Sequence, residues 1–569
     1  MDTTTNNEVK RNIFTMFIIA ALVGVVAGFG AVLFRYLIGI IHNLTFLGTL
    51  DPDYNANIHT SPSPLGAWII IVPVIGALFV SYLVKNFAPE AKGHGVPEVM
   101  EAIYLRESKI KPMVAMVKSL ASAISIGTGG SVGREGPIVQ IGSTFGSVMG
   151  TIINMPSKQR AILVAAGAAA GIAGTFNTPV GALAFGIELM LVSSSAYSIF
   201  LVTISVAIAT YIGRIFLGII PSFYLPKLAI PSFHVMQASE LLIFIIFGMI
   251  LGLVSIVFIR GLYWSEDMFA KIPGNYYTRH TLGMLCMGIL MYVLVEKTGH
   301  YYVQGVGYAT IVDVLTGVLS DPKFLLLLIA LKLLATCLTL GSGGSGGIFS
   351  PALYIGAASG GVFGMLINNI FPSLDINPVI LGIAGMAGMI SGTTGAVMTA
   401  IVMVVEMTND MNASLPVLIT VASSYFIRKT MSNDSVYTLK LSRRNEVAPE
   451  GLQASIAMAT HASNMMTNNF CIFDENRLND MNIKTLTVVE DSGNHTGIIN
   501  PRYIKSNLTD SINRQIIKLN ANELLTDVVC KINTASADYA LIYNDETLVG
   551  IIGKDEILKC VAATAELLE

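Results

Sequence analysis

The stretch "GTGGSVGREGP", residues 127–137, decides the fold of this chain. It sets Arg134 and Glu135 side by side among five glycines, directly before Pro137 and inside a strongly apolar part of the sequence. Glycine lets the backbone bend sharply and exposes its amide groups, and proline is favoured in the first turn of a helix. The stretch therefore predicts a tight turn that leads into a helix N-terminus at Gly133–Pro137.

The composition around this stretch is that of a polytopic membrane protein. Of 569 residues, 53% are hydrophobic and 12% are charged, whereas soluble proteins carry about 25% charged residues. Apolar runs stand out at 13–34, 65–84, 241–259 and 282–295, and the first three reach the roughly 20 residues of a spanning helix. Other runs are short or broken by glycine, which is typical of transporters whose helices stop inside the bilayer.

Several function classes lack support in the sequence. A net charge of −3 gives no argument for nucleic-acid binding. The five cysteines show neither C-x-x-C nor zinc spacing, so no metal site is expected. No Ser–His–Asp order and no phosphate loop with a lysine is found, so an enzyme is not expected. Lys10 and Arg11 precede a first apolar run too long for a signal-peptide core, which predicts an uncleaved helix and a cytoplasmic N-terminus.

A change in character near Leu441 predicts two domains. The membrane part covers 1–441, and residues 442–455 have the composition of a linker. From 456 to 569, strand-like runs alternate with polar helical stretches, at 484–491, 496–501, 539–545 and 548–558. We expect this tail to be a small cytoplasmic α/β domain.

The membrane part contains an internal repeat with an offset of 214 residues. Residues 118–150 lie over 332–364 with 14 identities in 33 positions and no gap, including Lys118 with Lys332. Each copy predicts a helix N-terminus after a glycine turn, the second at Gly347–Pro351. Helix N-termini carry unsatisfied amides and a partial positive charge. If both point inward at mid-membrane depth, they form an anion site without a full positive charge.

Charged residues near the two turns each have two open readings. Glu135 takes the place in copy one that Phe349 takes in copy two, and its carboxylate satisfies the donors that an anion would use. It either competes with the anion or simply caps the helix; an intramembrane carboxylate favours the functional reading. Arg134 reaches backbone carbonyls or partly balances Glu135. Lys118 and Lys332 raise the potential near the pore or anchor helix ends.

Three motifs give the chain a resemblance to the CLC family of chloride channels and proton/chloride exchangers. They are "GHGVP" (93–97), "GREGP" (133–137) and "GIFSP" (347–351). The resemblance implies an all-α membrane domain of two inverted repeats, in a homodimer with one pore per subunit. It also implies a multi-pass protein of the lipid bilayer, which we place in a bacterial inner membrane with both termini cytoplasmic. Chloride or a similar small anion is the expected transported ion, and no cofactor is expected.

The resemblance also assigns residues to the site. Glu135 matches the gating glutamate, and the backbone amides of Ile348 and Phe349 match donors to the central anion. Tyr437 resembles the pore tyrosine, with a membrane-interface anchor as the alternative. The remaining candidates for anion binding are His94 and Arg134, with Gly133, Gly136 and Gly347 forming the helix N-termini.

Two positions depart from the family pattern. His94 stands where the family commonly has a serine that contacts chloride; the imidazole either contacts the anion or turns away and leaves the backbone to do so. Leu189 follows Glu188 where exchangers commonly carry a second glutamate, the internal proton acceptor. Because leucine cannot carry a proton, passive or loosely coupled flux is expected. The alternative is stoichiometric exchange through another internal proton route.

The tail resembles a pair of CBS motifs, at 485–504 and 539–558. Paired CBS modules often bind adenosine nucleotides through an acidic residue, and only Glu556 could serve that contact here. Nucleotide binding is therefore not expected, and a structural or dimer-supporting tail is favoured. A membrane-anchored CBS sensor and a cation-coupled carrier are the alternatives of another class. Glu98, Glu101, Arg106 and Glu107 are expected to form a solvated helix end, and Glu406 is given no role.

Overall fold

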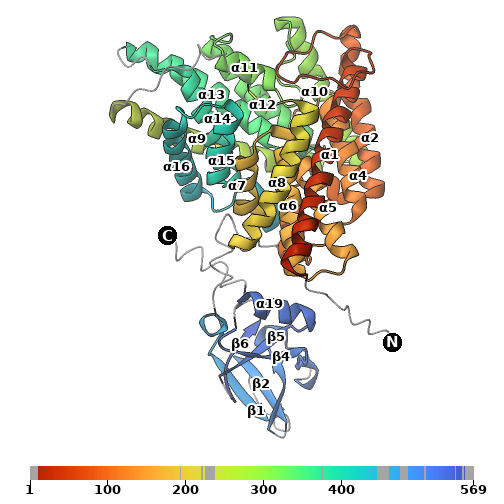
Figure 1. Cartoon of the computed structure of the whole chain (residues 1–569), viewed down its shortest axis with the longest axis vertical. Coiled ribbons are helices and arrows are strands. Elements are labelled where there is room, and N and C mark those ends of the chain that lie inside the picture. Colours follow the sequence, from red (N-terminus) through yellow and green to blue (C-terminus); the bar gives the residue numbers. More distant parts are fainter. Residues whose placement is uncertain are drawn as a thin grey trace. The chain divides into compact units, whose positions relative to one another are not determined.

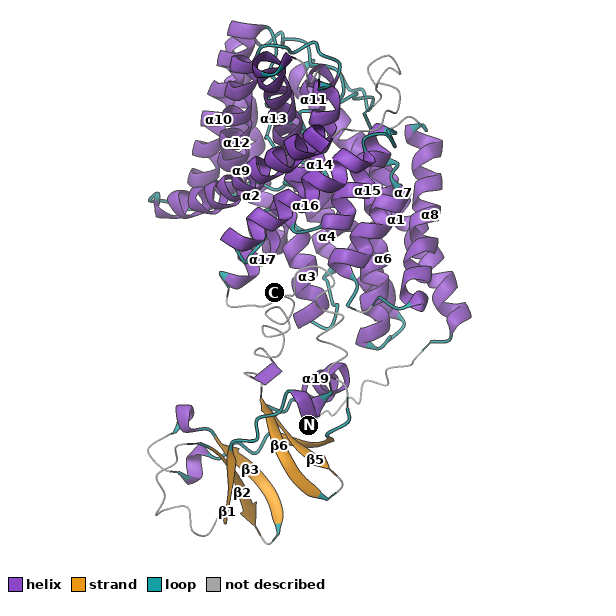
Figure 2. Ribbon diagram, turned by 90° about the vertical axis from the view of Figure 1, so that its left-hand side faces the viewer, coloured by secondary structure: helices purple, strands orange, loops and turns teal. Residues whose placement is uncertain are grey.

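The chain forms two compact units, Met1–Glu450 and Gly451–Glu569 (Figure 1). The computed structural model describes residues 11–192, 194–219, 222–223, 238–372, 376–444, 461–474, 485–491, 493–504, 508–523, 525–544, 546–553 and 556–557. The first unit is helical and the second holds the long strands (Figure 2). The predicted linker falls largely outside the described residues, so its boundaries stay a prediction.

The helices of the first unit follow the apolar runs of the sequence. They are α1 (Ile13–Phe46), α2 (Ile71–Phe87), α3 (Val96–Leu105), α4 (Pro112–Gly127), α5 (Glu135–Ile152), α6 (Ser157–Phe176), α7 (Pro179–Phe185), α8 (Ala196–Leu217), α9 (Ala238–Lys271), α10 (Tyr276–Thr298), α11 (Tyr308–Leu315), α12 (Pro322–Gly341), α13 (Phe349–Ile370), α14 (Pro378–Thr394), α15 (Val397–Thr408), α16 (Ser414–Met431) and α17 (Val436–Ser442). A short 3-10 turn, Gly66–Ile70, leads into α2, and a π-helical turn, Gly186–Met190, continues α7.

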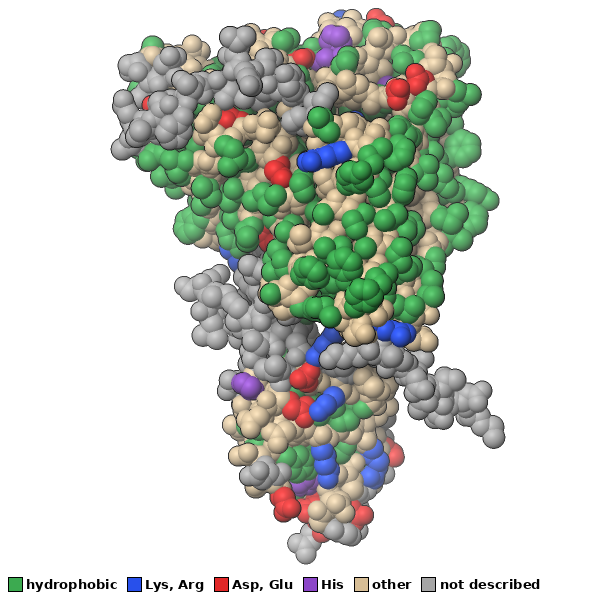
Figure 3. Space-filling model, in the orientation of Figure 1, with side chains coloured by type: hydrophobic (Ala, Val, Ile, Leu, Met, Phe, Trp, Pro, Cys, Tyr) green, Lys and Arg blue, Asp and Glu red, His purple; other side chains and the backbone are tan. Residues whose placement is uncertain are grey.

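Within the described residues, eight helices are long and apolar enough to cross a membrane. All four predicted apolar runs lie in such spans, in α1, α2 with its leading turn, α9 and α10. Large apolar side chains such as Phe29 on α1 and Phe200 on α8 remain exposed, and hydrophobic side chains are spread over the surface of the helical unit in the view of Figure 3. The chain is thus an integral multi-pass membrane protein.

The two repeats pack their helices in the same way. In the first repeat, α5 crosses α6 where Gly142 meets Gly167, and a Cβ on either residue would overlap the carbonyl oxygen of the other. In the second, α13 crosses α14 at Gly356 and Gly385, with the same reciprocal overlap. Gly356 lies 214 residues after Gly142, which is the offset of the sequence repeat. Glycine is required at these crossings because the backbones approach too closely for any side chain.

The tail also consists of two similar parts. Its strands are β1 (Phe470–Asp474), β2 (Leu486–Asp491), β3 (Asn494–Ile499), β4 (Ile516–Asn520), β5 (Tyr539–Asn544) and β6 (Thr547–Gly553), with helix α19 (Leu525–Thr534) before β5. They form two three-stranded sheets, β1-β2-β3 and β4-β5-β6. In each sheet the first pair is parallel and the second is antiparallel with a register shift. The sequence predicted β2, β3, β5 and β6, and it missed β1 and β4.

Candidate functional site

The glycine turns of the two repeats face each other. Gly133 donates its amide to the carbonyl of Gly347 at 2.7 Å, and Gly347 donates back to Gly133 at 2.6 Å. The first motif joins them, because Gly93 donates to the Gly344 carbonyl at 3.0 Å and accepts from Gly346 at 3.2 Å. The three sequence motifs therefore meet at one place, here called the crossing.

Two helices begin at the crossing with uncapped ends. The residues before α5 and α13 are Arg134 and Ile348, and neither side chain caps its helix. The first intrahelical bonds run from Ile138 to Arg134 at 3.1 Å and from Ala352 to Ile348 at 3.0 Å. The amides of Ile348 and Phe349 precede those bonds and have no acceptor within the helix. Two helix N-termini, each with a partial positive charge, therefore meet where the sequence predicted an anion site.

The Glu135 carboxylate is held at this crossing by hydroxyl groups. Glu135 is 4% exposed, and its Oε1 accepts from the Tyr308 hydroxyl at 3.1 Å and from the Ser350 hydroxyl. Its Oε2 has no hydrogen-bond partner among the described residues and lies 3.1 Å from the place of a Cβ on Gly347. The expectation that helix amides satisfy the carboxylate is wrong in this conformation: its donors among the described residues are side-chain hydroxyls, which no local sequence pattern indicates.

His94 and Tyr437 lie close together near the crossing. His94 is 1% exposed, and its ring centroid is 6.0 Å from that of Tyr437 and 6.5 Å from that of Tyr263. The Tyr263 hydroxyl lies 3.3 Å from Nε2 of His94, while Nδ1 has no partner in the described part of the chain. The His94 carbonyl packs against Gly136. Both the ring and the backbone of His94 therefore lie beside the predicted site residues.

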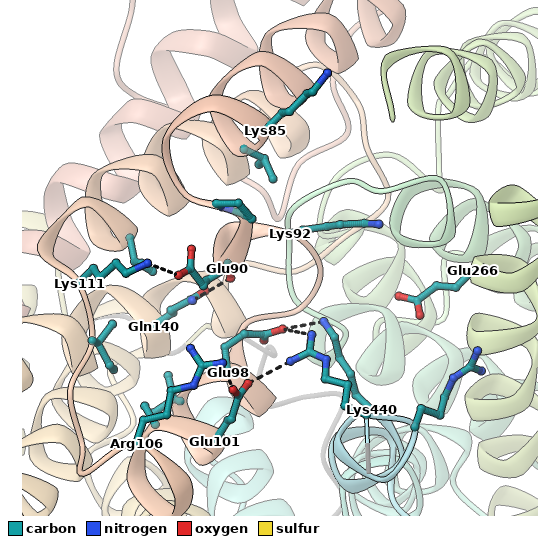
Figure 4. Close-up of a pocket in the computed structure, with 18 of the residues that line it drawn as sticks. Lys85, Glu90, Lys92, Glu98, Glu101, Arg106, Lys111, Gln140, Glu266 and Lys440 are labelled. Carbon is teal, nitrogen blue, oxygen red and sulfur yellow. Dashed lines mark hydrogen bonds and ion pairs between the residues drawn. The ribbon is translucent and has the colours of Figure 1, made fainter. Parts of the chain in front are cut away.

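A cavity of about 1350 Å³, here called the Lys440 cavity, is lined by Glu98 and Lys440 (Figure 4) and also by Tyr263, whose hydroxyl lies near His94. Its lining includes nine basic and six acidic side chains, and this positive excess favours anions. Glu98 pairs with Lys440 at 2.8 Å and with Arg444 at 3.3 Å, and Arg444 also pairs with Glu101 at 3.0 Å. Glu98 and Glu101 are nearly buried, so the predicted solvated helix end is wrong for both. Their ion pairs tie α3 to Lys440 of α17 and to Arg444, which follows that helix.

A second cavity, of about 400 Å³, is here called the Arg134 cavity. Arg134 directly precedes α5 and lines this cavity, together with Tyr308. Gln140 and Thr151, further along α5, line the Lys440 cavity instead. The residue before α5 therefore lines one cavity, and residues further along α5 line the other.

Residues 76–429, more than half of the chain, match the family described as voltage gated chloride channel. The chain belongs to this family. Among its curated relatives is the H(+)/Cl(-) exchange transporter ClcA of Vibrio parahaemolyticus, 31% identical over 438 residues, 76% of this chain and 90% of the relative. The transporter of the same name from Yersinia pseudotuberculosis is 31% identical over 436 residues, 75% of this chain and 87% of that protein.

Solved structures show that the chain has the CLC fold. A slow cyanobacterial Cl-/H+ antiporter aligns with a TM-score of 0.64 and 23% identity over 77% of this chain and 99% of the other. A CLC-type fluoride/proton antiporter gives 0.61 and 23% over 75% and 97% of the two chains. A eukaryotic CLC transporter gives 0.65 and 18% over 96% and 98%, so its alignment extends into the tail.

Two buried lysines hold the CLC-fold loops in both repeats. Lys118 is fully buried and donates to the carbonyls of Ala91 at 3.0 Å and Gly93 at 2.7 Å. Lys332 is equally buried and donates to the carbonyls of Val303 and Gly305, each at 3.0 Å. The geometry supports the anchoring alternative, because each ammonium ties down an irregular loop.

Glu188 and Glu406 cap each other's helices. Glu188 accepts from the amides of Met398 at 3.0 Å and Thr399 at 2.8 Å, in the first turn of α15. Glu406 accepts from the amides of Val180 at 3.1 Å and Gly181 at 2.7 Å, in the first turn of α7. Each glutamate follows the first residue of its own helix by nine positions, Pro179 in α7 and Val397 in α15. This symmetric exchange gives Glu406 a role that the sequence did not reveal.

Leu189 and Glu556 are the remaining predicted site residues. Leu189 is 4% exposed and packs in the apolar core of the CLC fold. In the tail, an oxygen of Glu556 accepts from the Gly553 amide at 3.0 Å, so the carboxylate proposed for a ribose already holds a backbone donor. Asn500 donates to the Tyr539 hydroxyl at 2.9 Å.

Proposed function

We propose that this chain is a proton-coupled exchanger of chloride or a similar small anion, with one pathway per subunit of a homodimer in a bacterial inner membrane. The observation that carries the proposal is the reciprocal bonding of Gly133 and Gly347, with the buried Glu135 carboxylate beside it. Relatives named H(+)/Cl(-) exchange transporters support the coupled form.

The proposed path runs from the Lys440 cavity past His94 and Tyr437 to the amides of Ile348 and Phe349. Beyond them the anion meets Glu135 and then reaches the Arg134 cavity. Partial charges of helix ends bind an anion weakly enough to release it, unlike a buried lysine. When charged, Glu135 blocks the path; when protonated or displaced by the anion, it leaves the path open.

Leucine at position 189 cannot accept a proton, which argues against tight coupling of proton and chloride movement. Passive chloride flux therefore stays as a second candidate function. The relatives' names favour the coupled alternative over the passive reading of the sequence. Glu188 is committed to capping α15 and cannot easily serve as a carrier. We therefore place the inner proton route through the Lys440 cavity, whose lining carries six acidic side chains, Glu266 among them.

The test is proton movement in liposomes that contain the purified chain and a chloride gradient. The proposal expects uphill proton transport in fixed proportion to chloride, lost in Glu135→Gln while chloride flux continues. Chloride flux without proton transport in the unmodified chain would establish the passive candidate. His94→Ser is expected to change anion selectivity or the pH dependence of flux; if neither changes, His94 lies outside the pathway.

For the tail, we propose a CBS-pair-like structural or dimer-supporting role. Its two sheets have the same strand order, which supports this proposal. Deletion of the tail is expected to leave measurable chloride flux, whereas complete loss would favour the anchored-sensor class. Thermal stabilisation of the full chain by ATP or AMP, absent in Glu556→Gln, would overturn the expectation that no nucleotide binds.

A further inference from the structure

Two guanidinium groups line the Arg134 cavity. Arg35 comes from α1, and Arg134 precedes α5. Arg134 is 6% exposed, and its Nε has no hydrogen-bond partner among the described residues. Its guanidinium carbon lies 4.7 Å from the ring centroid of Phe176 and 5.3 Å from that of Tyr308. The aromatic faces hold this cation in place without taking its N–H bonds.

No carboxylate neutralises these two cations within the described part of the chain. Neither Arg35 nor Arg134 forms an ion pair with any described acidic group, Glu135 included. Asp53 is the acidic residue in the lining. A third cation, Arg214, contacts the cavity lining from outside, because it donates to the lining residue Asn177 at 2.7 Å. Like charges in a partly buried space repel unless an anion lies between them.

We propose that the Arg134 cavity is a separate binding site for a small inorganic anion, chloride in the first instance, in addition to the site at the crossing. This inference rests on the proposed function for its ligand. The cavity, at about 400 Å³, has room for one anion with several waters, since a water occupies about 30 Å³. A guanidinium is weakly hydrated and holds such an anion without stripping it fully.

The position of Tyr308 gives this site a role in transport. Tyr308 lines the cavity and also donates its hydroxyl to Glu135. An anion between Arg35 and Arg134 is therefore one side chain away from the carboxylate that it must replace. A cavity that gathers anions next to the gate raises their local concentration there.

The flux test uses Arg35→Gln in the full chain, in liposomes, at a series of chloride concentrations. Half-saturating chloride is expected to rise about threefold to tenfold, while flux at saturating chloride is retained. Arg35→Lys keeps the charge and is expected to stay within about twofold of the unmodified chain. Arg260→Gln removes an exposed positive charge outside this lining and is expected to leave half-saturation unchanged.

A direct test is diffraction from crystals of the full chain soaked in bromide. The site predicts an anomalous peak between Arg35 and Arg134 that is lost in Arg35→Gln. Unchanged half-saturation in Arg35→Gln, an equal shift in Arg260→Gln, or no peak would each overturn the site. Those results, with normal flux in the unmodified chain, leave the proposed function intact; absence of any chloride flux in the unmodified chain would overturn the function itself.

Discussion

The turns at Gly133–Pro137 and Gly347–Pro351 share a backbone and differ in their side chains. Each begins a helix, and each bonds to the other through the amide and carbonyl of one glycine. Copy one carries Glu135 and Gly136 where copy two carries Phe349 and Ser350. Ser350, which is specific to copy two, donates a hydrogen bond to Glu135, which is specific to copy one. The duplicated turns thus provide the same backbone arrangement twice, and the side chains that differ between them provide the carboxylate and the hydroxyl that binds it.

The largest effect is expected from Gly136→Ser, which puts the residue of copy two into copy one. A Cβ at position 136 would overlap the His94 carbonyl oxygen and stand 3.2 Å from the Gly347 Cα. Overpacking of this kind costs about 3 kcal/mol or more. We expect loss of flux and a large drop in the thermal unfolding temperature in detergent.

Gly317→Ala is the control for that substitution. Unlike Gly136, which is helical, Gly317 has a left-handed backbone with φ +75°, and nothing lies within 4 Å of an added Cβ. Its cost is expected to be about 1 kcal/mol, from the left-handed conformation alone. Equal damage in the two variants would mean that the close approach at Gly136 is unimportant.

Next in size is removal of the hydroxyls that hold Glu135. Ser350→Ala and Tyr308→Phe each remove one donor to a carboxylate, and such bonds contribute about 1.5–3 kcal/mol. The carboxylate should yield more readily to the anion, and chloride flux at low chloride should rise about tenfold. Ser143→Ala removes a buried hydroxyl that, among the described residues, donates to the Val164 carbonyl alone, and it should not change flux. A lower or equal flux in both test variants would contradict a holding role.

The two reciprocal helix caps, Glu188 and Glu406, allow a direct comparison in which smaller losses of stability are expected. Glu188→Ala loses three donors at a buried helix end, including the Thr399 hydroxyl at 2.8 Å, and is expected to cost about 2 kcal/mol. Glu406→Ala loses two donors at a partly exposed end and is expected to cost about 1 kcal/mol. The order of the two unfolding temperatures checks this; the reverse order would show that burial does not set the strength of these caps.

The smallest effect is expected in the tail, where His495 of one sheet contacts Tyr543 of the other and makes the stability of the tail depend on pH. Partial burial lowers the pKa of His495 below its ordinary value, and its Nδ1 lies 2.5 Å from the Tyr543 hydroxyl. A depressed pKa favours the neutral ring in the folded state, so stability falls as the pH drops below about 6.5 and through the folded-state pKa. His495→Leu should reduce the acid-dependent part of tail unfolding in the full chain, followed by hydrogen exchange. An unchanged acid dependence would exclude His495 as its source.

The sequence predicted the crossing because glycine, proline and the repeat are local signals. It could not predict the hydrogen bond from Tyr308 to Glu135, since the two residues are 173 positions apart and a single tyrosine forms no recognisable sequence pattern. The Glu188 and Glu406 caps were hidden for the same reason: each bonds amides more than 200 positions away. Glu98 was read as solvated because charge near a helix end usually is, and only the packing of α17 against α3 buries it. Strands β1 and β4 were missed because each has only five residues; β1 is also largely exposed, and β4 is polar at two positions.

The most direct test of the central claim, that a carboxylate occupies an anion's place at the meeting of two helix ends, is the number of chloride ions bound per subunit. Calorimetric titration of the purified chain at pH 7.5 with chloride gives this number. Glu135→Gln is predicted to bind one chloride more than the unmodified chain. The same stoichiometry and affinity in both would contradict the account.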